Sequence, residues 1–359
     1  MNSRPSIWHS VLPFPRMRPR HFLKNYKSTA AKLTRGFWEM NISVVLATYN
    51  RAASLHITLE SFAKLRIPPS LNWELFVVDN NSSDATAGTV IRFIERFGSR
   101  VRYVFEGRQG RSAALNAGLA AAKGDLIAFT DDDVILDQDW LAQIHRAFDD
   151  PAVSGVAGRI LPLWNHPKPE WLEMDGQQAV VNFDLGSAPR WIEIAPMGAN
   201  SAFRREIFSK HGLFRLDLGV CGSRHTITCD DTEFGGRLMA AGDKILYWPD
   251  ALIHHPVDPA RTTKKYFVNW YYYNGVSLTR TAGLPDDVVY CLGVPRWLYR
   301  KALVDAGRWF TTIEPNKRFN RKLKTARSIG AIAESFRLSR EKAKVDSQTR
   351  LWGGPELSN

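Results

Sequence analysis

The chain has 359 residues, of which 44% are hydrophobic and 23% are charged, and this globular composition excludes an intrinsically disordered protein. Its three cysteines are too few for a disulfide framework and include no CxxC pair for zinc, and no apolar run reaches the roughly 20 residues of a membrane-spanning helix. The net charge of +12 is distributed unevenly along the chain. Residues 1–40 contain eight Lys or Arg and one Glu, and residues 261–359 contain 19 basic and 8 acidic residues. Residues 41–260, by contrast, contain 21 basic and 27 acidic residues.

The predicted elements start with the acidic segment and alternate between strand and helix. Short apolar or β-branched runs that end in polar turns predict buried strands at Asn41–Thr48, Trp73–Val78, Val101–Glu106 and Leu126–Thr130. Apolar residues at helical spacing predict helices at Leu55–Leu65, Thr86–Phe97 and Ser112–Lys123. Because strands and helices alternate at this spacing, we expect βαβ units and a largely parallel sheet flanked by helices.

The second part of the acidic segment has weaker patterns. In chain order they predict a helix near Gln138–Phe148, an irregular aromatic stretch over Pro151–Ile194, short helices at Arg204–Lys210 and Asp231–Ala241, and a strand at Lys244–Trp248. The stretch from Lys264 to Gly275 is dense in aromatic residues.

Three of the predicted strands end in polar clusters. These clusters are Thr48–Arg51, Asp79–Asp84 and Asp131–Asp133. The carboxyl ends of parallel strands meet at one edge of a sheet, which is where such sheets bind ligands. The sequence therefore predicts a single site built from all three clusters.

Asp131, Asp132 and Asp133 directly follow the apolar run Leu126–Thr130. Three adjacent carboxylates repel one another unless a cation lies among them. Carboxylate oxygens suit Mg²⁺ or Mn²⁺, whose coordination shells also accept phosphate oxygens. The alternative is an acidic turn that caps the following helix. The position at a strand end favours a metal site.

Two further clusters lie downstream. Asp230 and Asp231 open a predicted helix, where acidic residues are favoured electrostatically; alternatively, Asp231 is a general base that deprotonates an acceptor hydroxyl. His254 and His255 follow the strand at Lys244–Trp248, and a surface histidine pair usually has no function. Each cluster alone is a weak indication.

The order and spacing of all these clusters resemble the family 2 glycosyltransferases, which have the GT-A fold. Five blocks carry the resemblance between Ile42 and Pro256: ISVVLATYNR, VVDNNSSDAT, GRSAALNAGLAAAKGDLIAFTDDDV, MGANSAFRREIFSKHGLF and DDTEFGGRLMAAGDKILYWPDALIHHP. The resemblance implies a Rossmann-like, mostly parallel sheet and the transfer of a sugar from a nucleotide-diphospho-sugar to an acceptor hydroxyl.

The resemblance also implies roles for individual residues. Those implied to bind the nucleotide or donor are Thr48, Tyr49, Asn50, Arg51, Asp79, Arg111, Asn116, Asp131 and Asp132, with Asp79 accepting hydrogen bonds from the base, usually uracil. The implied acceptor-side loop and its neighbour are Gly198, Ala199, Asn200 and Asp230.

The metal and the catalytic base are implied in the same way. Asp133 and His255 would bind Mn²⁺ or Mg²⁺, and His255 fits the family pattern better than His254. Asp231 matches the catalytic carboxylate of the family's ED motif, although Asp230 stands where the family has Glu. One base and no second nucleophile imply an in-line displacement that inverts the anomeric centre.

The charge distribution divides the chain into a basic N-terminal extension (1–40), a catalytic domain (41–260) and a basic, helical C-terminal region (261–359). Within the last, Pro295–Phe310 predicts an amphipathic helix, with Leu298, Ala302, Ala306, Trp309 and Phe310 near one face and Arg300, Lys301, Asp305 and Arg308 near another. This helix either packs on the catalytic domain or binds an anionic membrane surface. The expected location is cytoplasmic, peripheral on the inner face of the cell membrane, with a saccharide or lipid-linked acceptor.

Three other functions fit parts of the sequence. A nucleotidyltransferase would be expected to carry a Gly-rich basic loop after its first strand, and ATYNRAAS is not one. A catalytically silent nucleotide-sugar sensor or membrane scaffold would not need Asp131, Asp133 and Asp231, all of which are present. Nucleic acid is not expected as a partner, because the basic charge avoids the folded middle.

Overall fold

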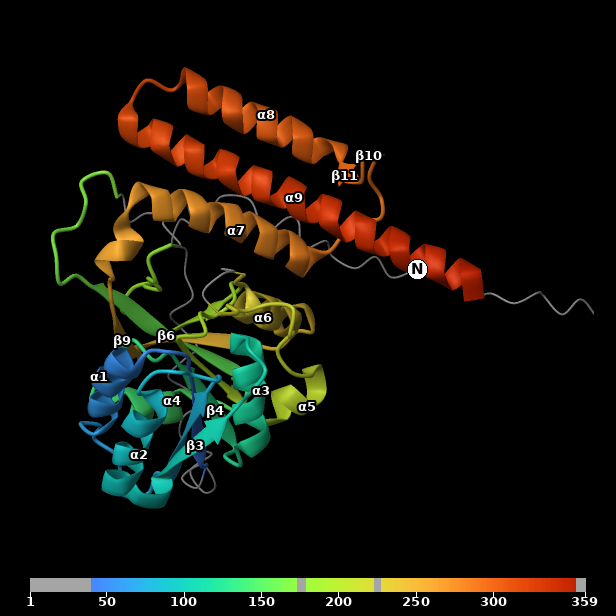
Figure 1. Cartoon of the computed structure of the whole chain (residues 1–359). Helices are drawn as coiled ribbons and strands as arrows, with labels where there is room; N and C mark the ends of the chain where they lie inside the picture. Colours follow the sequence, from blue (N-terminus) through green and yellow to red (C-terminus); the bar gives the residue numbers. More distant parts are fainter. Residues whose placement is uncertain (1–39, 173–178, 223–226, 353–359) are drawn as a thin grey trace, which may run out of the picture.

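The computed structural model describes residues 40–172, 179–222 and 227–352, so the predicted basic N-terminal extension lies outside the described residues apart from Met40. A twisted sheet flanked by helices forms the lower body, and three long helices lie together above it (Figure 1). The predicted α/β class with a helical C-terminal extension is confirmed. Within the described ranges, no helix has both the length and the apolar character needed to cross a bilayer.

The first half of the sheet is parallel, as the strand–helix alternation predicts. Its strands are β1 (Ile42–Thr48), β2 (Trp73–Asp79), β3 (Val101–Phe105) and β4 (Leu126–Thr130). They lie in the order β3-β2-β1-β4, and all three pairings are parallel. This arrangement brings the carboxyl ends of β1, β2 and β4 to one edge.

The second half of the sheet is mixed. Its strands are β5 (Ile135–Leu136), β6 (Gly155–Leu163), β7 (Arg190–Ile192), β8 (Asn200–Arg204) and β9 (Ile245–Pro256). The path continues from β4 through β8, β6 and β9 to β5, with β7 also on β9. Only the β6–β9 pair is parallel here.

Two expectations for this half of the sheet were wrong. The stretch Pro151–Ile194 contains β6, in which glycines and a proline interrupt the apolar run, and the strand predicted to end at Trp248 continues to Pro256. In β6, Gly158 pairs with Trp248 and the next residue, Arg159, pairs with Leu252 of β9. The three residues of β9 between Trp248 and Leu252 therefore form a bulge, after which the pairing continues to Pro256.

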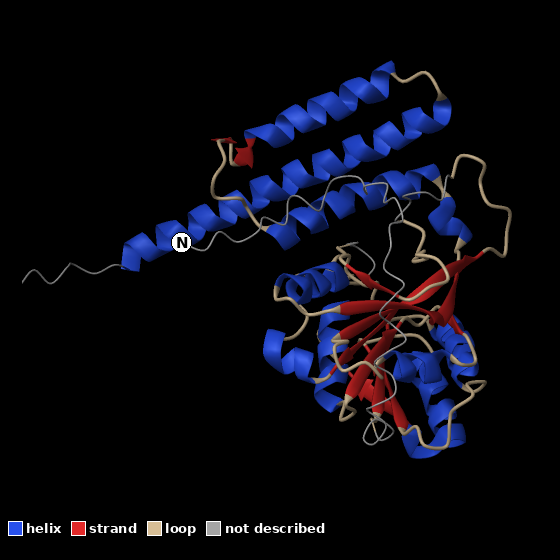
Figure 2. Cartoon of the chain, turned by 180° about the vertical axis from the view of Figure 1, so that it is seen from behind, coloured by secondary structure: helices blue, strands red, loops and turns tan. Residues whose placement is uncertain are grey.

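Helices cover both faces of the sheet (Figure 2). Side chains from alternate strand positions pack beneath them. Val44 and Leu46 of β1 pack with α1 (Ala52–Phe62), α2 (Thr86–Phe97) and α4 (Trp140–Ala147). Val45 lies on the other face, in a cluster with α3 (Arg111–Ala121), α5 (Glu206–His211) and α6 (Asp230–Ala240). This two-sided burial makes the parallel strands almost wholly apolar.

The C-terminal region consists mainly of α7 (Lys264–Ala282), α8 (Arg296–Thr311) and α9 (Pro315–Trp352). The aromatic stretch after Lys264 is helical, because Phe267 and Tyr271 are buried against α9. Gly275 and Gly330 face the partner helix so closely that a Cβ on either would overlap a backbone carbonyl. The two helices therefore approach at backbone distance.

Helix α8 packs on α9 through one face, which confirms that the helix is amphipathic. The buried residues differ in part from those predicted to share a face. Leu298 is buried as predicted. Asp305, predicted on the face with Arg300, Lys301 and Arg308, is also buried, where it accepts hydrogen bonds from Lys301 Nζ (2.7 Å) and Ser328 Oγ (2.8 Å). Phe310, predicted near the same face as Leu298, is 68% exposed.

Candidate active site

The turn after β1 is fixed to the turn after β2. Asn50 has a positive φ of 51° and accepts a hydrogen bond from the Ser83 N–H at 2.7 Å through Oδ1. Its own N–H donates to Ser82 Oγ at 2.9 Å. Thr48 is buried and Tyr49 is half-buried. The Asn50 side chain thus holds two of the predicted clusters together.

Asp79 ends β2 with its carboxylate enclosed. Oδ1 accepts the Ser82 N–H at 2.9 Å, and Oδ2 accepts the Tyr103 hydroxyl at 2.8 Å. Burial and this bond to Asp79 raise the pKa of Tyr103 to about 12, so Tyr103 remains a donor. Asp79 is 2% exposed and is oriented by these contacts.

Asn80 is a site residue that the sequence reasoning missed. Its Nδ2 donates to the carbonyls of Glu106 and Arg108, and its Oδ1 accepts the Gly110 N–H at 2.8 Å. These bonds fix the loop that leads from β3 into α3. An amide directly after the Asp79 position was the available signal, because a buried Asn usually bonds backbone groups.

Arg111, the first residue of α3, connects the two acidic clusters. Its guanidinium pairs with Asp131 at 3.0 Å and with Asp230. Burial alone would lower its pKa, but the carboxylates of Asp230 and Asp131 outweigh burial and raise the pKa well above its usual value. A Cβ at Gly198 would lie 2.6 Å from the same guanidinium, which explains glycine there.

Asp131, Asp133 and His255 form a set of candidate metal ligands. One ligand atom from each lies within 4.8 Å of the others. His255 Nε2 is 3.3 Å from Asp133 Oδ1, whereas His254 belongs to the β5 pairing and is not in the set. Two carboxylates and an imidazole fit Mn²⁺ or Mg²⁺, with the nitrogen favouring Mn²⁺.

The protonation of this set follows from its pairing. Burial would lower the pKa of His255, but the hydrogen bond and charge of Asp133 outweigh it and raise that pKa. Burial opposes ionisation of Asp133, yet His255, Arg51 and Arg261 hold its pKa well below its usual range. These neighbours therefore keep Asp133 ionised.

Two arginines lie against the same carboxylates. Arg51 pairs with Asp133 and approaches Asp132 Oδ1 at 3.5 Å. Arg261, which the sequence reasoning missed, lies 4.0 Å from Asp133. Asp132 is 6% exposed, and burial together with the charge of Asp133 raises its pKa to about 7. Asp132 is thus buried next to the candidate metal ligands but is not one of them.

Asp231 lies in the first turn of α6, facing the loop that holds Gly198. Its Oδ2 accepts the Gly198 N–H at 2.9 Å, and its Oδ1 accepts the Thr232 N–H at 2.7 Å. Burial and the neighbouring charge of Asp230 raise the pKa of Asp231. A half-buried carboxylate with a raised pKa is suited to accept a proton.

The side chains of two predicted site residues form hydrogen bonds that hold other parts of the fold together. Asn200 donates to the carbonyls of Arg159 and Ala251 and accepts from Trp140 Nε1 at 2.8 Å, so its side chain joins β6, β9 and α4. Both amide atoms of Asn116 bond the backbone of Phe214. Ala199 is buried. Only Gly198 of the predicted loop reaches Asp231.

The chain has similarities to known proteins. Residues 43–212 match the family model described as Glycosyl transferase family 2. Among curated proteins, the succinoglycan biosynthesis protein ExoM of Rhizobium meliloti is 26% identical over 62% of this chain and 69% of its own length. The glucosyl-dolichyl phosphate glucuronosyltransferase of Haloferax volcanii is 25% identical over 66% and 76%, and the O-antigen chain rhamnosyltransferase RfbN of Salmonella typhimurium is 25% identical over 65% and 71%.

A solved structure has a similar fold. The mannosyltransferase PcManGT of Pyrobaculum calidifontis, in complex with GDP-Man and Mn²⁺, superimposes with a TM-score of 0.51 at 20% sequence identity. The match covers 87% of this chain and 81% of PcManGT. This likeness shows that the two chains share the GT-A architecture.

Proposed function

We propose that the chain is an inverting glycosyltransferase of family 2, which transfers a sugar from a UDP-linked donor to an acceptor hydroxyl. The observation that carries this proposal is the Arg111 guanidinium, which joins Asp131 of the candidate metal set to Asp230, next to Asp231. One arginine thus fixes the diphosphate side of the site relative to the base.

The nucleotide is placed at the ends of β1 and β2. Asp79 is oriented by Ser82 and Tyr103, and its carboxylate oxygens would accept an N–H bond from a uracil ring. Thr48, Tyr49 and Asn50 line the adjoining turn. Arg111 and Arg51 supply positive charge near the diphosphate, and guanidinium groups bind phosphate oxygens well.

Asp131, Asp133 and His255 would hold the divalent ion, Mn²⁺ or Mg²⁺. When bound, the ion offsets the negative charge that develops on the departing nucleoside diphosphate. His255 and Asp133 orient each other at 3.3 Å, so the ligand set is already assembled by the protein.

Asp231 acts as the general base. The Gly198 N–H at 2.9 Å fixes one carboxylate oxygen on the acceptor side of the site, and the raised pKa of Asp231 increases its proton affinity. The base takes the proton of the incoming hydroxyl while that oxygen attacks the anomeric carbon opposite the leaving group. A single displacement of this kind inverts the anomeric centre.

Calorimetric titration with UDP, GDP and their sugar conjugates tests the proposal. GDP is included because PcManGT binds GDP-Man. We expect one nucleotide, UDP, to bind only when Mn²⁺ or Mg²⁺ is present. Binding of GDP alone would correct the donor. A folded protein that binds none of them would favour the silent scaffold and contradict the proposed enzyme.

The names of two relatives support a proposal for the acceptor class. ExoM is named for succinoglycan biosynthesis and RfbN for the O-antigen chain. We therefore propose a saccharide or lipid-linked acceptor of cell-envelope polysaccharide or glycolipid synthesis. Residues 41–260 would be the catalytic domain, and residues 261–359 would bring it to the cytoplasmic membrane surface.

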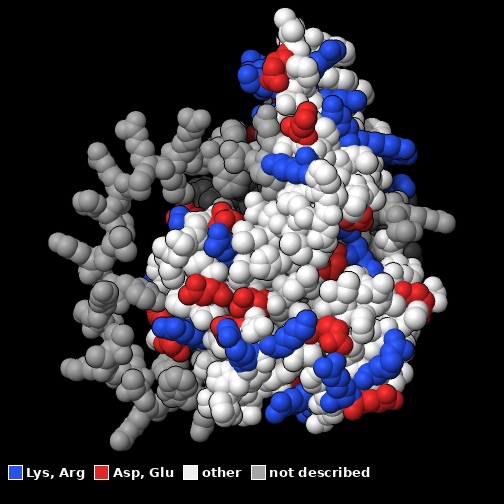
Figure 3. Space-filling view, turned by 90° about the vertical axis from the view of Figure 1, so that its left-hand side faces the viewer, with Lys and Arg blue, Asp and Glu red and all other residues white. Residues whose placement is uncertain are grey.

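The outer face of α8 supports membrane attachment. Leu303 (74% exposed), Phe310 (68%) and, just after the helix, Ile313 (94%) point away from α9. Arg296, Arg300 and Arg308 are exposed on the same helix, and Lys and Arg side chains gather over the C-terminal helices at the top of the face in Figure 3. Exposed apolar side chains beside basic ones are typical of helices that lie in an anionic membrane interface.

Vesicle binding tests this attachment. The protein should co-sediment with phosphatidylglycerol vesicles and much less with phosphatidylcholine, and the double variant Leu303→Glu/Phe310→Glu should lose binding because it places charge where acyl chains would lie. Ile91→Glu is the matched control, since Ile91 is 53% exposed on α2, in the acidic segment. Equal binding by the double variant and the control would contradict an α8 membrane face.

A further inference from the structure

The C-terminal helices contact an irregular segment that borders the candidate active site. This segment, Leu213–Gly222, connects α5 toward α6. The Val220 carbonyl accepts the Arg111 N–H at 2.9 Å, and the Leu218 carbonyl accepts Ser112 Oγ at 2.8 Å. The first of these bonds satisfies a backbone N–H at the start of α3, which has no partner within the helix.

The approach of the segment to α3 is close. Gly219 has a φ of +89°, and a Cβ there would lie 2.9 Å from Ser112 Oγ. Asn116 holds the Phe214 backbone at the other end of the same segment. The position of the segment thus determines where the first turn of α3, and with it Arg111, can lie.

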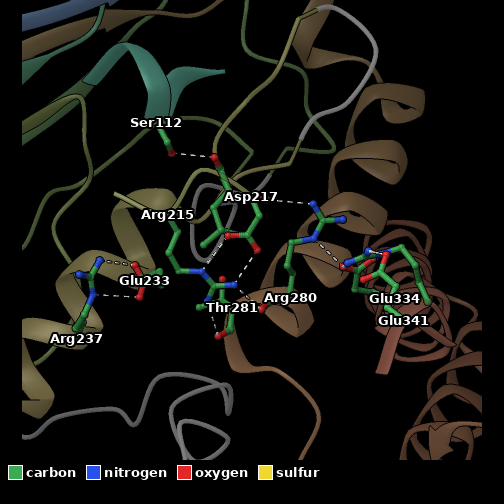
Figure 4. Close-up of polar contacts among 11 residues, drawn as sticks. Ser112, Arg215, Asp217, Glu233, Arg237, Arg280, Thr281, Glu334 and Glu341 are labelled. Carbon is green, nitrogen blue, oxygen red and sulfur yellow. Dashed lines mark hydrogen bonds and ion pairs between the residues drawn. The ribbon is translucent and has the colours of Figure 1, made fainter. Parts of the chain in front are cut away.

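The opposite side of the segment is held by α7 and α9 (Figure 4). Arg280 donates to the Asp217 carbonyl at 3.1 Å and to Glu334 Oε1 at 2.7 Å. Arg215 pairs with the Asp217 carboxylate at 2.8 Å and donates to the Thr281 carbonyl at 3.3 Å. Glu334 is 3% exposed on α9, so Arg280 spans from a buried carboxylate to the segment.

Helix α7 also contacts the chain just before the proposed base. Ser277 Oγ accepts the Thr228 N–H at 2.9 Å. Ile227, Leu218 and Val276 form one buried apolar cluster. Helix α6 begins two residues after Thr228, with Asp230 and Asp231 in its first turn. Helix α7 therefore supports both the segment that holds the start of α3 and the chain that leads into α6.

We propose that Arg280 is a positioning residue for the reaction and that Glu334 fixes it, so that the C-terminal helices set the location of Arg111. Helices α7 and α9 lie beyond residues 43–212, so the range that matches the family model includes neither Arg280 nor Glu334. The inference rests on the donor-binding role given to Arg111 in the proposed function.

The test compares Arg280→Gln with Arg337→Gln. Arg337 also bonds Glu334, at 2.9 Å from Nε to Oε2, but none of its hydrogen bonds reaches the segment. Each variant removes one ion pair from the same buried carboxylate, and Arg337→Gln also removes the pair with the exposed Glu341, so we expect Tm to fall in both variants. Only Arg280→Gln should weaken binding of UDP in the presence of Mn²⁺, by roughly 10- to 100-fold, the scale of a misplaced site.

A double-mutant cycle completes the design. Ser112→Ala removes the hydroxyl that bonds Leu218, so Arg280→Gln should weaken nucleotide binding much less in that background than in the wild type. Equal nucleotide affinities for Arg280→Gln and Arg337→Gln, or additive effects of Arg280→Gln and Ser112→Ala, would overturn the positioning role. A wild-type protein that binds neither UDP nor GDP would instead overturn the proposed function.

Discussion

Replacement of Asp231 by Asn should abolish sugar transfer while leaving the donor bound. Asn keeps the shape that meets the Gly198 N–H but cannot accept a proton, so the acceptor hydroxyl is no longer activated. General-base catalysis contributes about 10²- to 10⁴-fold, and a loss of that size is expected. Release of nucleoside diphosphate from the donor, measured with a cell-envelope fraction as acceptor, reports the loss, and calorimetry reports the retained affinity.

Glu233→Gln is the matched control for this change. Glu233 lies in the same first turn of α6 but pairs with Arg237, away from Gly198, so its removal should leave turnover unchanged. Because burial and Asp230 raise the pKa of Asp231, wild-type turnover should fall as the pH drops through that pKa, where the base becomes protonated. Full turnover by Asp231→Asn would refute its role as base.

Replacement of Asp133 by Asn should abolish metal-dependent nucleotide binding. Asp133 lies in the ligand set with Asp131 and His255, and it is the member that His255 contacts directly. Loss of an outer-shell partner alone costs about 10- to 100-fold in metal affinity, so loss of a ligand should cost at least about 100-fold. Titration with Mn²⁺, followed by its electron paramagnetic resonance signal, measures this without a turnover assay.

Asp132→Asn provides the comparison for Asp133→Asn. It replaces the adjacent buried carboxylate, but Asp132 is not one of the three clustered ligands. We expect Mn²⁺ affinity to change far less in this variant. If the two variants bind Mn²⁺ equally well, with affinities close to that of the wild type, the metal site lies elsewhere.

The parallel half of the sheet and the acidic clusters could be predicted because their signals are local. Each of the strands β1, β2 and β4 is a short apolar run that ends in its own polar turn. The carboxyl ends of parallel strands converge for any such sequence. Hence Asp79, Asp131 and Asp133 could be placed at one edge before any partner was known.

The remainder depends on contacts between distant residues. Helix α7 is aromatic and β-branched, a composition with modest helix propensity, and it is stabilised by packing on α9. Asn116 and Asn200 lie in blocks that resemble donor- and acceptor-binding loops, yet their side chains bond the backbone of other elements. The buried face of α8 is determined by its contacts with α9, such as the hydrogen bond from Ser328 to Asp305. In each of these cases the two residues in contact are far apart in the sequence, so local patterns could not reveal the contact.

The order of the strands has a consequence for synthesis on the ribosome. The first four paired strands are complete once Thr130 has emerged, so a parallel core can assemble early. Asp131 and Asp133 then wait more than a hundred residues for His255, and Arg280 and Glu334 follow later still. A chain that stops before His255 therefore contains the parallel strands without the complete set of candidate metal ligands, and the site is complete only after α7 and α9 have been made.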